Sequence, residues 1–174
     1  MKTSLRNALA ALTLLCGICS PVLAQQKPDA IINIDGIGFS RMIEGELVAF
    51  DLVSAYDDNM IVEANCSAFK SKVQGVEWCF SSAVNQSSFE SATQDNGRNK
   101  YLPFVGGHCA LGMSRGNLTA KGDPRTAIRI GDLLVLNGRF SVRTMFLEDT
   151  ARNVDNARLR YDLAIAAGNL KVND

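Results

Sequence analysis

Two short runs of alternating apolar and polar residues, joined by a two-residue link, constrain the fold most strongly. The runs are residues 68–73 and 76–80, and Gln74-Gly75 joins them. Glycine adopts the positive φ that a tight hairpin turn needs, so the sequence predicts an antiparallel β-hairpin. The length of the turn also sets the register, in which Lys70 lies opposite Cys79.

The hairpin sorts its side chains onto two faces. Trp78 and Phe80 share one face, which places them in the core or in a pocket, and Cys79 lies on the other. Cys66 lies beyond Lys70, the residue opposite Cys79. A Cys66–Cys79 disulfide therefore requires the first strand to bend or end near Cys66.

The remaining patterns predict an α+β fold. It is a single domain with a small antiparallel sheet, made of hairpins, packed against short helices. We expect the first hairpin to pack on a helix within 107–114 and the C-terminal helices to cover the sheet. The other expected elements are one or two strands within 30–54, a turn at 57–59, a helix at 83–92 capped by Ser81-Ser82, a turn at 95–97, a second hairpin of 127–130 and 133–136, and helices at 141–150 and 153–167.

Residues 1–24 have the pattern of a cleaved signal peptide. Lys2 and Arg6 precede an apolar stretch that is too short to span a bilayer, and residues 22–24 form a small-residue cleavage site. The pair Cys16 and Cys19 would be removed with this segment. We therefore expect a mature domain of residues 25–174 that is periplasmic or secreted.

The composition of the mature chain excludes some partners. Without Lys2 and Arg6 it has 16 basic residues against 18 acidic ones, and no basic stripe stands out. Nucleic acid is therefore not an expected partner. No apolar run in residues 25–174 approaches the roughly 20 residues of a membrane span, so we expect none after signal cleavage.

The run of residues 101–110 holds the chemically most active side chains. Gly106-Gly107 allows a sharp change of direction into a short helix predicted at 108–114, and Cys109 follows His108, the one histidine of the chain. In the first turn of a helix, backbone N–H groups and the helix dipole favour a thiolate. A thiolate and an imidazole together suit copper(I) or zinc, provided that His108 lies just before the helix.

Other interpretations of these cysteines stay open. Cys66, Cys79 and Cys109 survive signal cleavage, and an odd number leaves at least one of them outside an internal disulfide. A cysteine after Gly-Gly is often a small buried apolar residue. The mature chain has no CxxC, HxxxH or two-histidine carboxylate spacing, and the GxSxG letters at 112–116 lack a preceding strand.

Residues within 68–149 match the pattern of a known family. The matching residues are Gly75, Trp78, Phe80, Ser81, Ser82, Asn85, Phe89, Tyr101, Pro103, Gly106, Gly107, Cys109, Ala110, Asp123-Pro124 and Asn137-Gly138. In these residues the chain resembles the YHS domain, a small module of uncertain role that is suspected of binding metal. It departs from the family pattern at three places: Cys79 replaces an aromatic, His108 replaces a tyrosine, and Ala127-Ile128 stands where a tryptophan is usual. In some relatives the position of Cys109 is selenocysteine, which implies a redox or soft-metal role.

Three hypotheses follow. In the first, an exported YHS-like domain binds copper or zinc through Cys109 and His108, with Cys79 or Cys66. In the second, Cys109 attacks a substrate disulfide and Cys66 or Cys79 resolves the product. In the third, the domain has a structural or partner-binding role and its cysteines only pack. The sequence assigns no catalytic residue and no organic cofactor.

Overall fold

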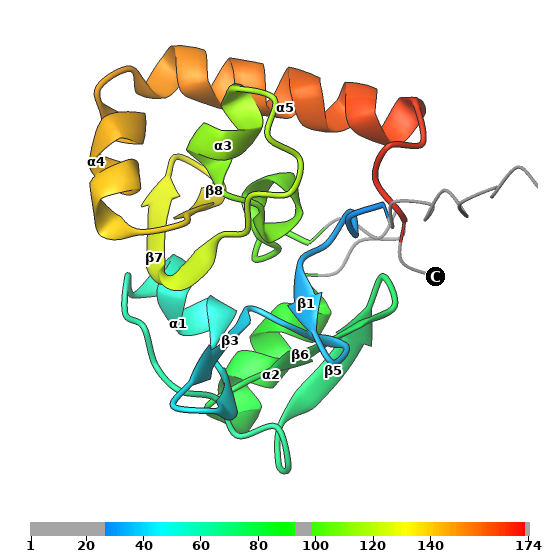
Figure 1. The fold of residues 1–174 in the computed structure, drawn as a ribbon. Helices are drawn as coiled ribbons and strands as arrows, with labels where there is room; N and C mark the ends of the chain where they lie inside the picture. The colour runs from blue at the N-terminus through cyan, green and yellow to red at the C-terminus, as the bar shows by residue number, and fades with distance from the viewer. Residues whose placement is uncertain (1–26, 93–98, 173–174) are drawn as a thin grey trace, which may run out of the picture.

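Short hairpins and short helices alternate along the chain and form the predicted α+β fold (Figure 1). The computed structural model describes residues 27–92 and 99–172, so the signal peptide predicted at 1–24 and the turn predicted at 95–97 lie outside the described residues. In chain order the elements are β1 (Asn33–Ile34), β2 (Ile37–Gly38), β3 (Ser40–Ile43), β4 (Glu46–Ala49), α1 (Leu52–Asp57), β5 (Lys70–Val73), β6 (Val76–Cys79), α2 (Ala83–Ser91), the 3-10 turn η1 (Phe104–Gly107), α3 (Ala110–Ser114), β7 (Asp123–Ile130), β8 (Leu133–Asn137), α4 (Phe140–Leu147) and α5 (Thr150–Ala166).

The predicted first hairpin is confirmed together with its register. Strands β5 and β6 are antiparallel, and Lys70 lies opposite Cys79. Gln74 and Gly75 both have positive φ, as the turn requires. Strand β2 adds to β6 in parallel, with Ile37 beside Glu77, so the sheet of order β1-β2-β6-β5 is mixed and not purely antiparallel.

The N-terminal region is more finely divided than the alternation predicts. Residues 30–54 form four short strands and the start of helix α1, where we expected one or two strands. Positive φ at Asp35, Phe39 and Glu44 turns the chain after only a few residues, and this limits the length of each strand. The pattern of apolar residues carries no sign of these turns.

Buried Asp51 joins α1 to the start of α2. One carboxylate oxygen accepts hydrogen bonds from the backbone N–H groups of Val53 (2.9 Å) and Ser54 (3.1 Å) and so caps α1. The other oxygen accepts from the N–H and hydroxyl of Ser81 and from the side-chain amide of Asn85, each at 2.7 Å. Five donors thus converge on one carboxylate that is 0% exposed.

The buried side chains form two clusters. The first contains Trp78 and Phe80, which pack with Phe89 of α2; β5, β6 and α2 lie in the lower part of Figure 1. The second contains Met113 of α3 and Phe146 of α4, which are fully buried; α3, α4 and α5 lie in the upper part of Figure 1. Helix α3 therefore packs against α4, α5 and β8, and the expectation that the first hairpin packs on this helix is wrong.

The C-terminal half follows the predicted order. Strands β7 and β8 pair antiparallel around Gly131-Asp132, as expected, although β7 begins earlier, at Asp123. The two predicted helices are α4 and α5, within a few residues of their expected ends. A bulge between Asp123 and Ile128 interrupts the pairing, and no local pattern indicates it.

Candidate functional site

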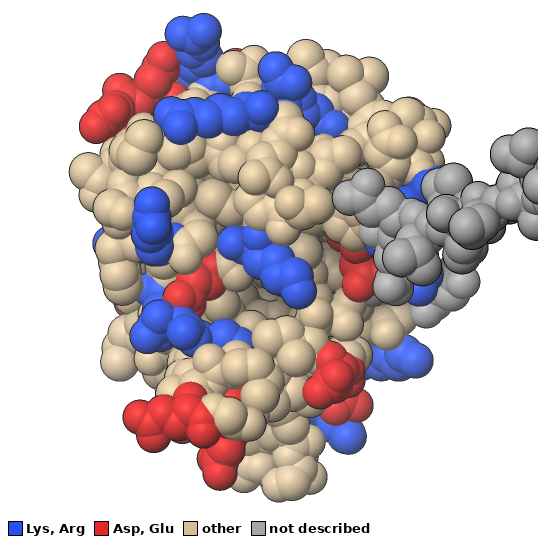
Figure 2. Space-filling view, viewed as in Figure 1, with Lys and Arg blue, Asp and Glu red and all other residues tan. Residues whose placement is uncertain are grey.

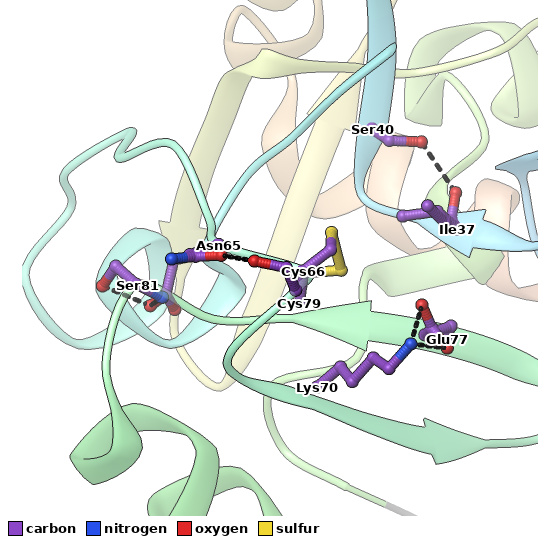
Figure 3. Close-up of a disulfide and its surroundings, with 10 residues drawn as sticks. Ile37, Ser40, Asn65, Cys66, Lys70, Glu77, Cys79 and Ser81 are labelled. Carbon is purple, nitrogen blue, oxygen red and sulfur yellow. Dashed lines mark hydrogen bonds and ion pairs between the residues drawn. A yellow bond between two sulfur atoms is a disulfide. The ribbon is translucent and has the colours of Figure 1, made fainter.

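Cys66 and Cys79 are joined to each other by a disulfide (Figure 3). Their sulfur atoms are 2.04 Å apart and their Cα atoms 4.8 Å apart. Strand β5 begins only at Lys70, because the chain turns at 66–68 and the N–H of Phe69 donates to the carbonyl of Asn65. Strand β5 therefore does not extend back to Cys66. This meets the condition for the disulfide, which was that the strand bends or ends near Cys66.

Residues Val105, Gly106 and Gly107 all have left-handed backbone and redirect the chain toward α3. Their φ values are 47°, 63° and 80°. A Cβ on Gly106 would lie 1.9 Å from the carbonyl oxygen of Ala30, so only glycine fits there. Val105 is the unusual member, because a β-branched side chain strongly disfavours positive φ. Such strain concentrates at functional sites.

Cys109 is the free thiol among the described residues, and it is buried. It is the N-cap of α3, not a residue of its first turn as predicted, and its sulfur accepts from the N–H of Gly112 at 3.4 Å. The Cys109 thiol also lies 3.9 Å from Oδ1 of Asn137. The sulfur therefore has a structural role in ending the loop and starting the helix.

His108 is 0% exposed and lies just before α3. Its Nε2 donates to the carbonyl of Asp29 at 3.0 Å, which leaves Nδ1 buried without a hydrogen-bond partner among the described residues. Burial lowers the pKa of His108, since the imidazolium loses its hydration, and the neighbouring carbonyls of Asp29, Ala30 and Ala120 only partly offset this effect.

The four predicted ligands do not come together as one metal site. Cys66 and Cys79 hold each other, and consecutive extended residues direct the side chains of His108 and Cys109 to different partners. In the described part of the chain, no three His, Cys, Asp or Glu residues are placed to hold a metal ion. Two donors fall short of the four that a structural zinc site needs. The disulfide also leaves Cys109 without a free resolving cysteine.

A cleft of about 800 Å³ lies beside the left-handed turn. This volume is typical of small-molecule sites. Trp78 lines the cleft and is only 1% exposed, so the residue belongs to both the core and a pocket. The walls combine apolar groups with a few charged ones; they include Ile31, Phe104, Val105, Lys100, Arg158 and Tyr161.

The polar groups of the cleft have distinct surroundings. Lys100 lies over the Tyr101 ring, with Nζ 4.6 Å from its centre, and 3.9 Å from a carboxylate oxygen of Asp57. A hydrogen bond with Tyr101 is the main cause that raises the pKa of Lys100. Burial, with a smaller contribution from Asp162, raises the pKa of Tyr161 to about 12. Its hydroxyl donates to the carbonyl of Ala30 at 3.0 Å.

Sequence patterns could not have identified most of this cleft. Only Trp78 was predicted at a pocket, and Lys100, Arg158 and Tyr161 stand in stretches without a motif. They meet because β6, the segment of Lys100 that precedes η1, and α5 all contribute to the cleft lining. The one local sign was the Gly106-Gly107 pair, which indicated an unusual turn.

Comparison of the chain with models of known families, with curated proteins and with solved structures finds no match. In residues 27–92 and 99–172 no helix has the length and apolarity that crossing a bilayer needs. Acidic and basic side chains are interspersed on the face shown in Figure 2. The function is therefore inferred from the residues of the site itself.

Proposed function

We propose that this chain is an exported, non-catalytic binding domain related to YHS domains, and that the cleft beside Val105–Gly107 is its ligand site. One observation carries the proposal: Gly106, one of the residues on which the resemblance depends, lines the cleft together with Val105. A strained backbone beside a cleft of this volume is typical of a binding site.

Like the third sequence hypothesis, this proposal gives the cysteines a packing role, and it adds a ligand cleft that the sequence did not predict. Metal binding by Cys109 and His108 stays a prediction, but the side chains as placed give it no third ligand. A thiol oxidoreductase would need a free partner for Cys109, and Cys66 and Cys79 are already paired. The binding hypothesis requires no rearrangement of the cysteines.

The test is a titration of the ¹⁵N-labelled mature chain with three small probes: indole, benzoate and benzamidine. We expect saturable NMR shifts for at least one probe, centred on the amides of Leu102, Phe104, Val105 and Tyr161. Substituting Leu102→Trp, which adds volume at the cleft wall, should weaken them. Shifts scattered over the surface, or none for all three probes, would contradict the proposal.

Export is tested separately by sequencing the N-terminus of the protein isolated from its native host. We expect the mature chain to begin near Gln25. An intact N-terminus in a cytoplasmic fraction would contradict export and leave the ligand site unaffected.

A further inference from the structure

Arg158 and Asp162 lie one turn apart on α5, and both line the cleft. Opposite charges at this spacing commonly pair. Here they do not: among the described residues neither has a counter-ion within 4.0 Å. The cleft therefore presents one cation and one anion that are both available to a ligand.

The other charges of the cleft already have partners. Lys100 lies 3.9 Å from Asp57, and Asp132 lies 3.9 Å from Arg129. A purely anionic ligand would meet Asp162, and a purely cationic one would meet Arg158. A ligand that carries both charges avoids either repulsion.

A contact with the cleft wall positions Arg158, and a second cavity adjoins Asp162. The guanidinium of Arg158 lies 5.8 Å from the centre of the Phe104 ring, a cation–π contact with the cleft wall. A second cavity of about 450 Å³ shares Ile31, Tyr161 and Asp162 with the cleft and continues along α5 to Ile165. An apolar groove thus extends from the two charges.

We propose that the cleft binds short peptides with free termini, with the terminal carboxylate at Arg158, the terminal ammonium at Asp162 and the side chains on the apolar walls. This inference rests on the proposed function. Helical positions four apart have Cβ atoms roughly 6 Å apart, and two extended residues span about 7 Å. A dipeptide can therefore contact both charges at once.

The experiment is an NMR titration of the mature chain with the dipeptide L-alanyl-L-phenylalanine and with its N-acetylated, C-amidated form. We expect the free dipeptide to bind in the cleft and the blocked one to bind roughly tenfold more weakly, as expected when two exposed ion pairs are lost. The variants Arg158→Gln and Asp162→Asn should each weaken binding of the free dipeptide about threefold.

Matched controls lie on the same helix. Arg152→Gln and Asp155→Asn make the same charge changes at exposed positions that do not line the cleft, and they should leave the affinity unchanged. Equal affinity for the free and blocked dipeptides, or no binding of the free one, would overturn this inference. If indole or benzoate still bound in the cleft, the proposed function would stand.

Discussion

Replacing Gly106 with alanine tests whether the left-handed turn depends on close contact with the N-terminal segment. The added Cβ would lie 1.9 Å from the carbonyl oxygen of Ala30, which is backbone and cannot rotate away. The Ala30 carbonyl also accepts the hydroxyl hydrogen bond of Tyr161, and the carbonyl of Gly106 accepts from the N–H of Ile32 at 2.8 Å. Relief of the clash must displace these contacts.

The expected cost has two parts. An alanine at φ of 63° costs about 1–2 kcal/mol in any left-handed position. Loss of the two hydrogen bonds adds roughly 1 kcal/mol each. We therefore expect Gly106→Ala to lower the free energy of unfolding by about 3–4 kcal/mol, or the midpoint of thermal unfolding by roughly 6–16 °C for a chain of this size.

Gly131→Ala is the matched control. Gly131 has a similar φ of 57°, and nothing lies within 4 Å of the position its Cβ would take. This variant should pay only the conformational part, about 1–2 kcal/mol. Urea unfolding followed by Trp78 fluorescence measures both variants. Equal destabilisation by the two substitutions would refute the steric argument.

Three further predictions concern single side chains. Burial lowers the pKa of His108, so the unfolded chain binds the proton more tightly than the folded chain does. The free energy of unfolding should therefore fall as the pH drops below about 6.5. His108→Gln should flatten this dependence of stability on pH between pH 7.5 and 5.5. An unchanged slope would show that other groups cause it. Asp51→Ala should cost about 3–5 kcal/mol because five donors, two of them buried backbone N–H groups, lose their acceptor. The exposed control Asp58→Ala should change the unfolding free energy by less than about 0.5 kcal/mol. Similar values for the two variants in chemical denaturation would contradict the role of Asp51. Cys109→Ser keeps an N-cap acceptor and should preserve stability, while Cys109→Val should lower the free energy of unfolding by about 1 kcal/mol. The soft-metal prediction further requires that the serine variant loses copper(I) or zinc binding in a calorimetric titration. Identical titrations of the wild-type protein and the serine variant would reject the soft-metal prediction.

Local chemistry determined much of the fold. The Gln74-Gly75 turn set the hairpin register, and the Ser81-Ser82 pair marked the start of α2, where the Ser82 side chain caps the helix. Both features depend on residues within a few positions of each other, so a sequence contains all the information they need. Helix α1 was missed because its capping residue, Asp51, follows an apolar run that is typical of a strand.

The site depended on contacts between distant segments. From the sequence, a Cys66–Cys79 disulfide was possible on the condition that the first strand of the hairpin bends or ends near Cys66. The turn at 66–68 that meets this condition is seen only in the folded structure. His108 and Cys109 are neighbours in the chain, yet Asp29 and Asn137 hold them apart. The cleft joins Ile31, Trp78, Val105 and Arg158. Packing of many side chains brings these positions together. Because the packing energy is a sum over contacts between distant segments, no local sequence pattern predicts which residues meet in the cleft.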